Sequence, residues 1–431
     1  MHVLRGQTVS LGIVEGELRL GNNATIQASN GKKVTVAKGV YLEGKAYVNC
    51  DLECESIESE VFISKTKEAR LGSERARMEL TGRFAGKLEV NGNLSVRKKL
   101  SVSHTVHVKG TIDASDIDIG GKVQADIIRC NNIRVGGQAD VQSRFEATTV
   151  DVGGKVSAPG AVQIGDLHVG GEAEVGGGTI SGNIRVGGKF SSKSQLEFGE
   201  LLVYGKGNLP GGCKGHKIST FGRLEVSGNL TCEIIEVAGV VEIDGDCSAK
   251  YVEVGGRLEA SGSLDVSDEL LGNGVIEIGH DLKGTHLRVS GKLEAGRVVI
   301  NEEADISGKL ETKNGLRAKL LNIRSGSHCE GILIGEHVDV GKSADLSYGT
   351  WGPYWSKWSG VGGAAKVDDV YAKEVTIGSL SRASRVFGER VKLEQGAAVN
   401  QVIYTIELKT DLGAVIREHI KKVTDLPNPP P

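Results

Sequence analysis

Hydrophobic and polar residues alternate along most of this chain in short segments. Leu88-Glu89-Val90, Leu224-Glu225-Val226 and Val252-Glu253-Val254 are examples. In a strand, successive side chains point to opposite faces, so this alternation is typical of strands that bury one face. Glycine follows many of these segments and allows a tight turn or a close approach of two backbones. The pattern therefore predicts many short strands joined by tight corners.

The strands recur with a fixed spacing of 17 residues. The tripeptide Val-Gly-Gly starts at Val135, Val152, Val169 and Val186. Related positions follow in the same register at Val203, Thr220, Val237 and Val254, and, after a slip of one residue over two periods, at Val289, Ile306, Ile323 and Val340. A finer spacing of six joins Val90, Val96, Val102 and Val108. A period of 17 thus divides into three short strands.

These periods predict an all-β fold, a parallel β-helix (β-solenoid) with three faces and about 17 residues per coil. Each coil stacks on the previous one, and stability accumulates from the contacts between coils. The inward residues fill a narrow core with little room for aromatic side chains, which make up 4% of the chain. We expect right-handed coiling, because left-handed hexapeptide helices keep a strict 18-residue coil that this chain lacks.

The regularity of the repeat divides the chain into five segments. They are irregular N-terminal coils or a cap (1–85), the regular β-helix (86–345), an aromatic Gly-rich loop (346–364), further β-helix coils (365–410), and a C-terminal cap helix or final coil with a Pro-rich tail (411–431). After the aromatic loop the period becomes 16, at Val370, Val386 and Val402. The charged run at 64–77 is expected to be a protruding loop or the outer face of distorted coils.

Composition and charge exclude several classes of protein. Glycine accounts for 62 of 431 residues but does not recur every third residue, so the chain is not collagen. The net charge of −3 argues against a bulk nucleic-acid binder. No run of apolar residues is long enough for a transmembrane helix, and the N-terminus lacks a signal-peptide pattern. The seven cysteines have no finger-like or disulfide spacing, and we expect them to be small core residues. We expect a cytoplasmic protein.

No catalytic, cofactor or metal motif is found. Gly341-Lys342-Ser343 lacks the glycine spacing of a phosphate-binding loop. The stretch 207–217 is glycine-rich and basic but fails the same test, and we interpret it as a loop that bulges from one coil. His216 lies in that stretch and has the residue type, without the strict hexad, of a β-helix acyltransferase base. The recurring Glu of the Leu-Glu-Val segments is expected to be a solvated outward residue, although a carboxylate cluster on one face stays open as an alternative.

One segment holds all three tryptophans. The candidate residues for binding a partner or a membrane are Tyr348, Trp351, Tyr354, Trp355, Lys357 and Trp358. Three interpretations stay open: a lid over the end of the core, a partner-binding hot spot, or an anchor at the headgroup level of a membrane, where Lys357 suits anionic lipid.

The Val-x-Val-x-Gly coils of period 17, quoted above at Val135, Val152 and their successors, resemble those of the bactofilin (polymer-forming cytoskeletal) family. The resemblance covers about residues 85–345 and extends in texture to about 410. It implies a right-handed β-helix that polymerises end to end without nucleotide, and many members bind membranes through a short terminal segment. This chain differs in its greater length and in the late aromatic loop.

Two classes of function follow from the sequence. The first is a structural scaffold, not an enzyme and without cofactors, whose partners are copies of itself and, through the tryptophan segment, a protein or a membrane surface. The end coil of a β-helix has unpaired N–H and C=O groups, so it must be capped or paired. The alternative is a β-helix enzyme or ligand-binding protein that acts on carbohydrate or acyl substrates.

Overall fold

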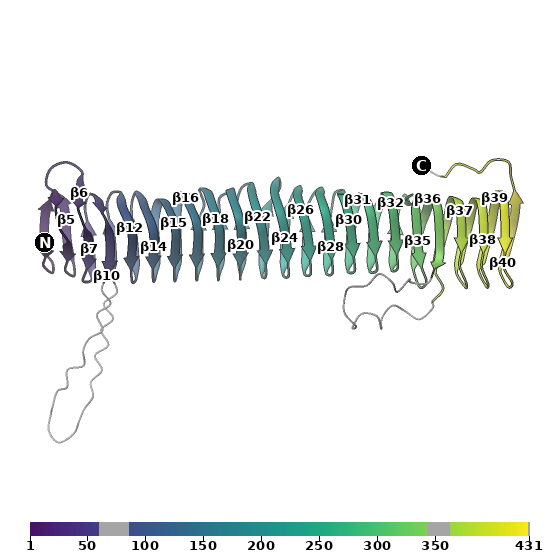
Figure 1. Cartoon of the computed structure of the whole chain (residues 1–431), viewed down its shortest axis with the longest axis horizontal. Coiled ribbons are helices and arrows are strands. Elements are labelled where there is room, and N and C mark those ends of the chain that lie inside the picture. Colours follow the sequence, from purple (N-terminus) through teal and green to yellow (C-terminus); the bar gives the residue numbers. More distant parts are fainter. Residues whose placement is uncertain (60–85, 343–362, 430–431) are drawn as a thin grey trace, which may run out of the picture. The chain divides into compact units, whose positions relative to one another are not determined.

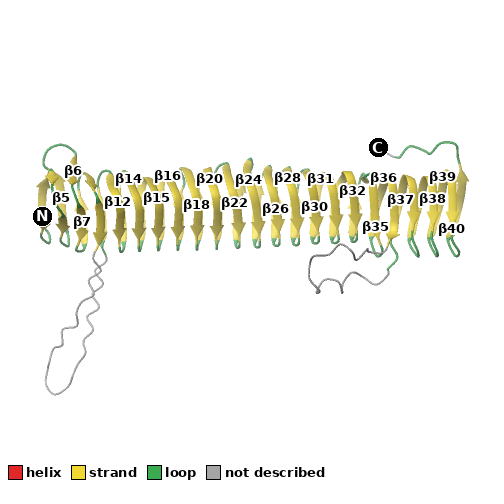
Figure 2. Cartoon of the chain, viewed as in Figure 1, coloured by secondary structure: helices red, strands yellow, loops and turns green. Residues whose placement is uncertain are grey.

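The protein forms a parallel β-solenoid. The computed structural model describes residues 1–59, 86–342 and 363–429, and within these ranges it contains strands and turns but no helix (Figure 2). The chain makes about 22 turns of about 17 residues each. The all-β, β-solenoid prediction and its period are therefore confirmed, while right-handed coiling stays a prediction.

The strands are short at the start of the chain and often continue around a corner later (Figure 1). The first half contains β1 (His2–Val3), β2 (Thr8–Leu11), β3 (Ile13–Val14), β4 (Leu18–Leu20), β5 (Ala24–Ala28), β6 (Lys33–Val36), β7 (Gly39–Leu42), β8 (Lys45–Val48), β9 (Asp51–Cys54), β10 (Ser56–Ser59), β11 (Lys87–Val90), β12 (Leu94–Val102), β13 (Thr105–Val108), β14 (Thr111–Ile119), β15 (Lys122–Val135), β16 (Gln138–Val152), β17 (Lys155–Ala158), β18 (Ala161–Val169), β19 (Glu172–Val175), β20 (Gly178–Val186), β21 (Lys189–Ser192), β22 (Leu196–Val203) and β23 (Lys206–Pro210).

The second half follows the same plan. It contains β24 (Cys213–Thr220), β25 (Arg223–Ser227), β26 (Leu230–Val237), β27 (Val240–Ile243), β28 (Cys247–Val254), β29 (Arg257–Ala260), β30 (Leu264–Gly272), β31 (Val275–Val289), β32 (Lys292–Ile306), β33 (Lys309–Thr312), β34 (Leu316–Arg317), β35 (Leu320–Arg324), β36 (His328–Lys342), β37 (Lys366–Ile377), β38 (Arg382–Leu393), β39 (Ala398–Thr410) and β40 (Val415–Lys422). By its contacts the chain divides into two units, Met1–Leu209 and Pro210–Pro431, and each is described by itself.

Each turn has three strand positions, which gives the three predicted faces. β11 pairs in parallel with β13, and the two parts of β12 pair with the two parts of β14. The residues spaced by six, Val90, Val96, Val102 and Val108, are all at most 1% exposed. They therefore mark the inward position of successive faces, as the sequence predicted.

The core consists of the inward residues of every strand. In Leu258–Ala260 the flanking side chains are at most 1% exposed while Glu259 is exposed, and the same alternation runs through most strands. Valine, isoleucine, leucine and alanine dominate these ladders, so side chains of similar size stack on one another from turn to turn. Apolar burial removes surface from water at about 25 cal/mol per Å² and holds the coils together.

The register of the strands accounts for both irregularities of the period. Val254 pairs with Gly272, one residue later than the usual 17, because a bulge after Ala249 inserts one residue into the next turn. After residue 363 the turns shorten to 16 residues, and Val386 pairs with both Val370 and Val402. The predicted slip and the predicted period of 16 are both confirmed.

Two predicted features lie outside the described residues. They are the charged run at 64–77 and the aromatic segment with Tyr348, Trp351, Tyr354, Trp355, Lys357 and Trp358. The solenoid continues on both sides of each gap: Ala46 pairs with Leu88, and Val338 pairs with Val375.

The segment after residue 411 forms a strand. The sequence left a helix or a final coil open, and β40 pairs in parallel with β39. The helical spacing of Leu412, Val415, Ile416, Ile420 and Val423 did not identify the structure, because a strand that turns a corner can carry apolar residues at similar intervals.

Candidate assembly surfaces

The last strand leaves an open edge at the end of the second unit. β40 pairs with β39, and no strand among the described residues pairs with its other edge. Ile416 and Ile420 occupy the inward ladder positions opposite Val399 and Val402. Val399 and Val402 are fully buried, whereas Ile420 is 59% exposed. The apolar core is therefore open to solvent at this edge.

Further apolar side chains gather around the same edge. Leu412 is 88% exposed, and Ile406 and Val415 are each 50% exposed. In the regular turns such positions are polar or glycine, so a cluster of exposed apolar residues is a feature of this end. Exposed apolar patches on a folded protein commonly mark an interaction site.

The first coil of the first unit forms the second edge. Its strands β1, β2 and β3 pair only with β4, β5 and β6 among the described strands. The inward residues Val3, Leu11 and Val14 are at most 8% exposed, so the core is better covered here than at β40. Met1, Leu4 and Ile13 are nevertheless more than half exposed.

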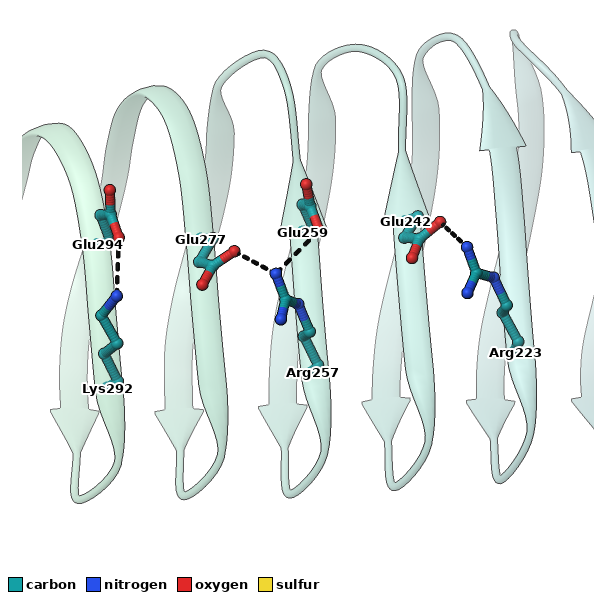
Figure 3. Close-up of polar contacts among 7 residues, drawn as sticks. All are labelled: Arg223, Glu242, Arg257, Glu259, Glu277, Lys292 and Glu294. Carbon is teal, nitrogen blue, oxygen red and sulfur yellow. Dashed lines mark hydrogen bonds and ion pairs between the residues drawn. The ribbon is translucent and has the colours of Figure 1, made fainter.

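A ladder of charges runs along one face of the second unit (Figure 3). The outward carboxylates stack from turn to turn in the order Glu225, Glu242, Glu259, Glu277, Glu294, Glu311 and Glu330. The predicted outward position of the Leu-Glu-Val glutamates is thereby confirmed. The cations stand two residues earlier in each strand, with Val240 and Val275 between the arginines and Lys292.

Each cation next to a valine bridges two turns. Arg257 donates to Glu259 of its own strand at 3.3 Å and to Glu277 of the next turn at 2.6 Å. Arg223 likewise contacts Glu225 and Glu242. One guanidinium therefore compensates two stacked carboxylates, and the ladder neutralises itself instead of presenting a free acidic cluster.

The lysines later in the ladder shift the proton affinities of their partners. Lys309 lowers the pKa of Glu311 through a direct hydrogen bond, and Lys292 lowers it further. The pKa of Lys309 is raised by the same contact. Both ions are thus stabilised in their charged forms, which is the behaviour of a structural ion pair.

The cysteines are thiols packed among apolar residues. All seven are free, and all but Cys130, which is half-buried, are buried. Burial raises the pKa of Cys54, Cys232 and Cys329 to about 12. A thiol with such a pKa is a poor nucleophile and a poor metal ligand. Among the described residues, no group of three His, Cys, Asp or Glu side chains could hold a metal ion.

The basic stretch around His216 is not a bulging loop. Cys213–Lys217 is part of β24, in register with β26. Lys217 lies 2.7 Å from Glu236, and His216 lies 3.2 Å from Glu233. These carboxylates compensate the cations that an anion site would need. The prediction of a loop was wrong because two adjacent glycines mark a corner here.

The first unit carries a shallow polar hollow of about 860 Å³. It crosses successive turns and is lined by hydroxyl and amide side chains, including Ser115, Asn131, Thr148 and Ser181, and by the ion pair of Arg129 and Glu146. Ala114 and Ala147 form part of its floor. Their small side chains leave the surface concave.

One pair of aromatic residues was missed by the sequence analysis. The rings of Tyr371 and Phe387 stack with centroids 4.2 Å apart on neighbouring turns. The signal was present, because the period of 16 that relates Val370 to Val386 also relates the residues that follow them.

The described part of the chain defines a β-solenoid with open end coils and a self-compensating charge ladder. It contains no helix with the length and apolar character that crossing a membrane would require. A search found no matching protein-family model, no matching curated protein and no matching solved structure.

Proposed function

We propose that this protein is a structural scaffold of the bactofilin-like cytoskeletal type, which assembles by stacking the end coils of its β-helix without nucleotide. The exposed inward isoleucine at the open edge, Ile420, is the observation on which this proposal rests. The repeat texture described above supports the family assignment.

The driving force is the completion of a core and a sheet. A second copy that stacks on β40 pairs its unpaired N–H and C=O groups and covers Ile416 and Ile420. Neither process consumes chemical energy, so assembly needs no nucleotide. The charged residues of β40, such as Arg417 and Lys421, discourage unspecific pairing at the same edge.

We further propose that the protein is not an enzyme and needs no cofactor. The ionisable side chains discussed above are compensated by neighbours of opposite charge or are buried thiols, which suits a structural role.

The test is direct observation of assembly. Purified, untagged protein without nucleotide is examined by negative-stain electron microscopy and by sedimentation over a range of salt and protein concentrations. We expect filaments or end-to-end oligomers whose length grows with protein concentration. Single molecules at every concentration would contradict the proposal and would show that the end coils are capped.

The polar hollow of the first unit supports a second candidate, a carbohydrate-binding protein. Its hydroxyl and amide groups repeat from turn to turn at the strand spacing of about 4.8 Å, which suits an extended glycan. Calorimetric titration with neutral and acidic oligosaccharides tests this candidate. Heat of binding that disappears in Asn131→Ala and Thr148→Ala would favour it.

The tryptophan segment is proposed as the contact for a membrane surface or a protein partner. Tryptophan and tyrosine prefer the headgroup level of a bilayer, and Lys357 adds attraction to anionic lipid. We expect the protein to co-sediment with anionic liposomes, and the triple change of Trp351, Trp355 and Trp358 to alanine to abolish this. Absence of binding by the unchanged protein, or binding that survives the triple change, would rule out the membrane contact.

A further inference from the structure

One outward ladder of the second unit changes from polar to apolar along the chain. Its first members are polar: Lys214, Thr231, Ser248, Asp265 and Lys283. Its later members are Val299, Arg317, Ile334, Tyr371, Phe387 and Ile403. An outward position does not need an apolar residue for folding, because the core is already filled from the inward side. The change therefore indicates that something packs on this face.

The corner next to the apolar ladder is hollowed. Gly335, Ala372 and Gly388 stack on one another at the position that directly follows Ile334, Tyr371 and Phe387. A shallow hollow of about 340 Å³ lies at the earlier end of this corner and is lined by residues that include Val299, Ala318, Ile334 and Gly335. The ladder forms an apolar wall and the small residues form a floor, so together they make a groove across several turns.

The chain after β40 turns back toward this part of the solenoid. Figure 1 shows the segment leaving the end of β40 and running back in the direction of β36. The amide of Val423 donates a hydrogen bond to the carbonyl of Tyr404 at 2.9 Å. Leu426 and Pro429 are half-buried although they follow the last strand. Phe387 is only 5% exposed although its ladder faces outward.

We propose that residues 424–429 dock in this groove as an extended strap, with Leu426 and the prolines against the ladder of Tyr371 and Phe387. A segment rich in proline adopts an extended conformation with little entropy left to lose, and aromatic-lined grooves bind such segments. The groove is therefore a docking site for an extended peptide that contains leucine and proline, and its occupant is the tail of the same chain.

The test separates the tail from the groove. A chain that ends at Lys422 is prepared, and a fluorescent peptide of residues 423–431 is titrated against it by anisotropy. We expect the shortened chain to bind the peptide, and the full chain to bind it at least tenfold more weakly because its own tail fills the groove. Phe387→Ala in the shortened chain should weaken binding at least tenfold, while the control Ser248→Ala, in the polar part of the same ladder, should not.

Other results overturn the proposal. A shortened chain with native circular dichroism that does not bind the peptide, or binding that Phe387→Ala leaves unchanged, excludes the groove. Equal binding by full and shortened chains excludes docking of the chain's own tail. A second measurement uses the full chain: Leu426→Asp should speed amide exchange at Val423 and in the tail at least tenfold, and unchanged exchange would also overturn the proposal.

Discussion

The two glycines of a Val-Gly-Gly unit have different neighbours. A Cβ atom on Gly256 would lie 2.0 Å from the carbonyl oxygen of Gly239 in the preceding turn, whereas on Gly255 the nearest atom would be 3.7 Å away. The sequence shows the consequence: the first position accepts Ala238, Asn273 or Ser290, but the second is glycine in each of these turns. The second glycine is therefore required by the close approach of successive turns.

This difference predicts the outcome of two neighbouring substitutions. Gly256→Ala must push two backbones apart, and we expect a loss of about 1–3 kcal/mol in the free energy of unfolding. Gly255→Ala meets no close atom, and we expect a change within about 0.5 kcal/mol. Urea denaturation followed by circular dichroism measures both. Equal effects of the two substitutions would show that close approach does not explain the second glycine.

At the scale of the element, the charge ladder joins turns that are already joined by backbone hydrogen bonds. Exposed ion pairs contribute little individually, about 0–1 kcal/mol each. Their arrangement matters more, because parallel in-register strands force like carboxylates to stack. Arg257, which reaches Glu259 and Glu277, relieves this repulsion at the cost of one cation for two turns.

The ladder predicts a dependence of stability on pH. The pKa of Glu311 is lower in the folded protein than in the unfolded chain, chiefly because of Lys309. Its contribution to stability is therefore present above the unfolded pKa of about 4.3 and is lost as the pH falls through the folded pKa. We expect Lys309→Met to make the loss of stability between about pH 5 and pH 3 shallower, as measured by thermal unfolding.

A matched control distinguishes this pair from general acid effects. Lys250 is an exposed lysine for which no ion pair is found among the described residues. Lys250→Met should leave the acid limb of the stability curve unchanged. An acid limb that is the same in Lys309→Met and in the unchanged protein would mean that this contact does not stabilise the folded state.

At the scale of the whole molecule, the end coils decide whether the solenoid stops or continues. Every internal turn finds a neighbour on both sides, but β40 exposes Ile420 where the preceding turn buries Val402. A repeat fold provides no signal of its own for where to stop, since each turn offers the next the same edge. Termination must come from capping residues or from another copy.

The end coil therefore predicts the effect of charged substitutions on assembly. We expect the double change Ile416→Asp and Ile420→Asp to abolish concentration-dependent assembly in sedimentation velocity, because the carboxylates would be buried at the contact between copies. Both positions belong to the last strand, so the turns before them should keep their stability. Thr231→Asp, on an outward ladder far from the end in sequence, should assemble normally. Assembly that survives the double change would place the contact elsewhere.

Much of the fold could be predicted because a solenoid repeats a local pattern. The alternation around Glu225 and Glu253 identified strands, and the spacing of Val135 and Val152 identified the length of a turn. Even the extra residue before Gly272 was visible as a slip in the period. The candidate site was less predictable, because an end coil has the same composition as an internal one. β40 is an example, since its apolar residues also matched a helix.

The sequence alone determined the class of fold, the number of faces and the length of the turn, because inward and outward positions alternate within a few residues of one another. The tertiary structure decided what depends on register between turns: which glutamates share one ladder, that Arg257 bridges two of them, that Tyr371 stacks on Phe387, and that Ile420 has no neighbour above it. These features join residues that are 16 or more positions apart. A local pattern specifies each strand but not which strand lies beside it.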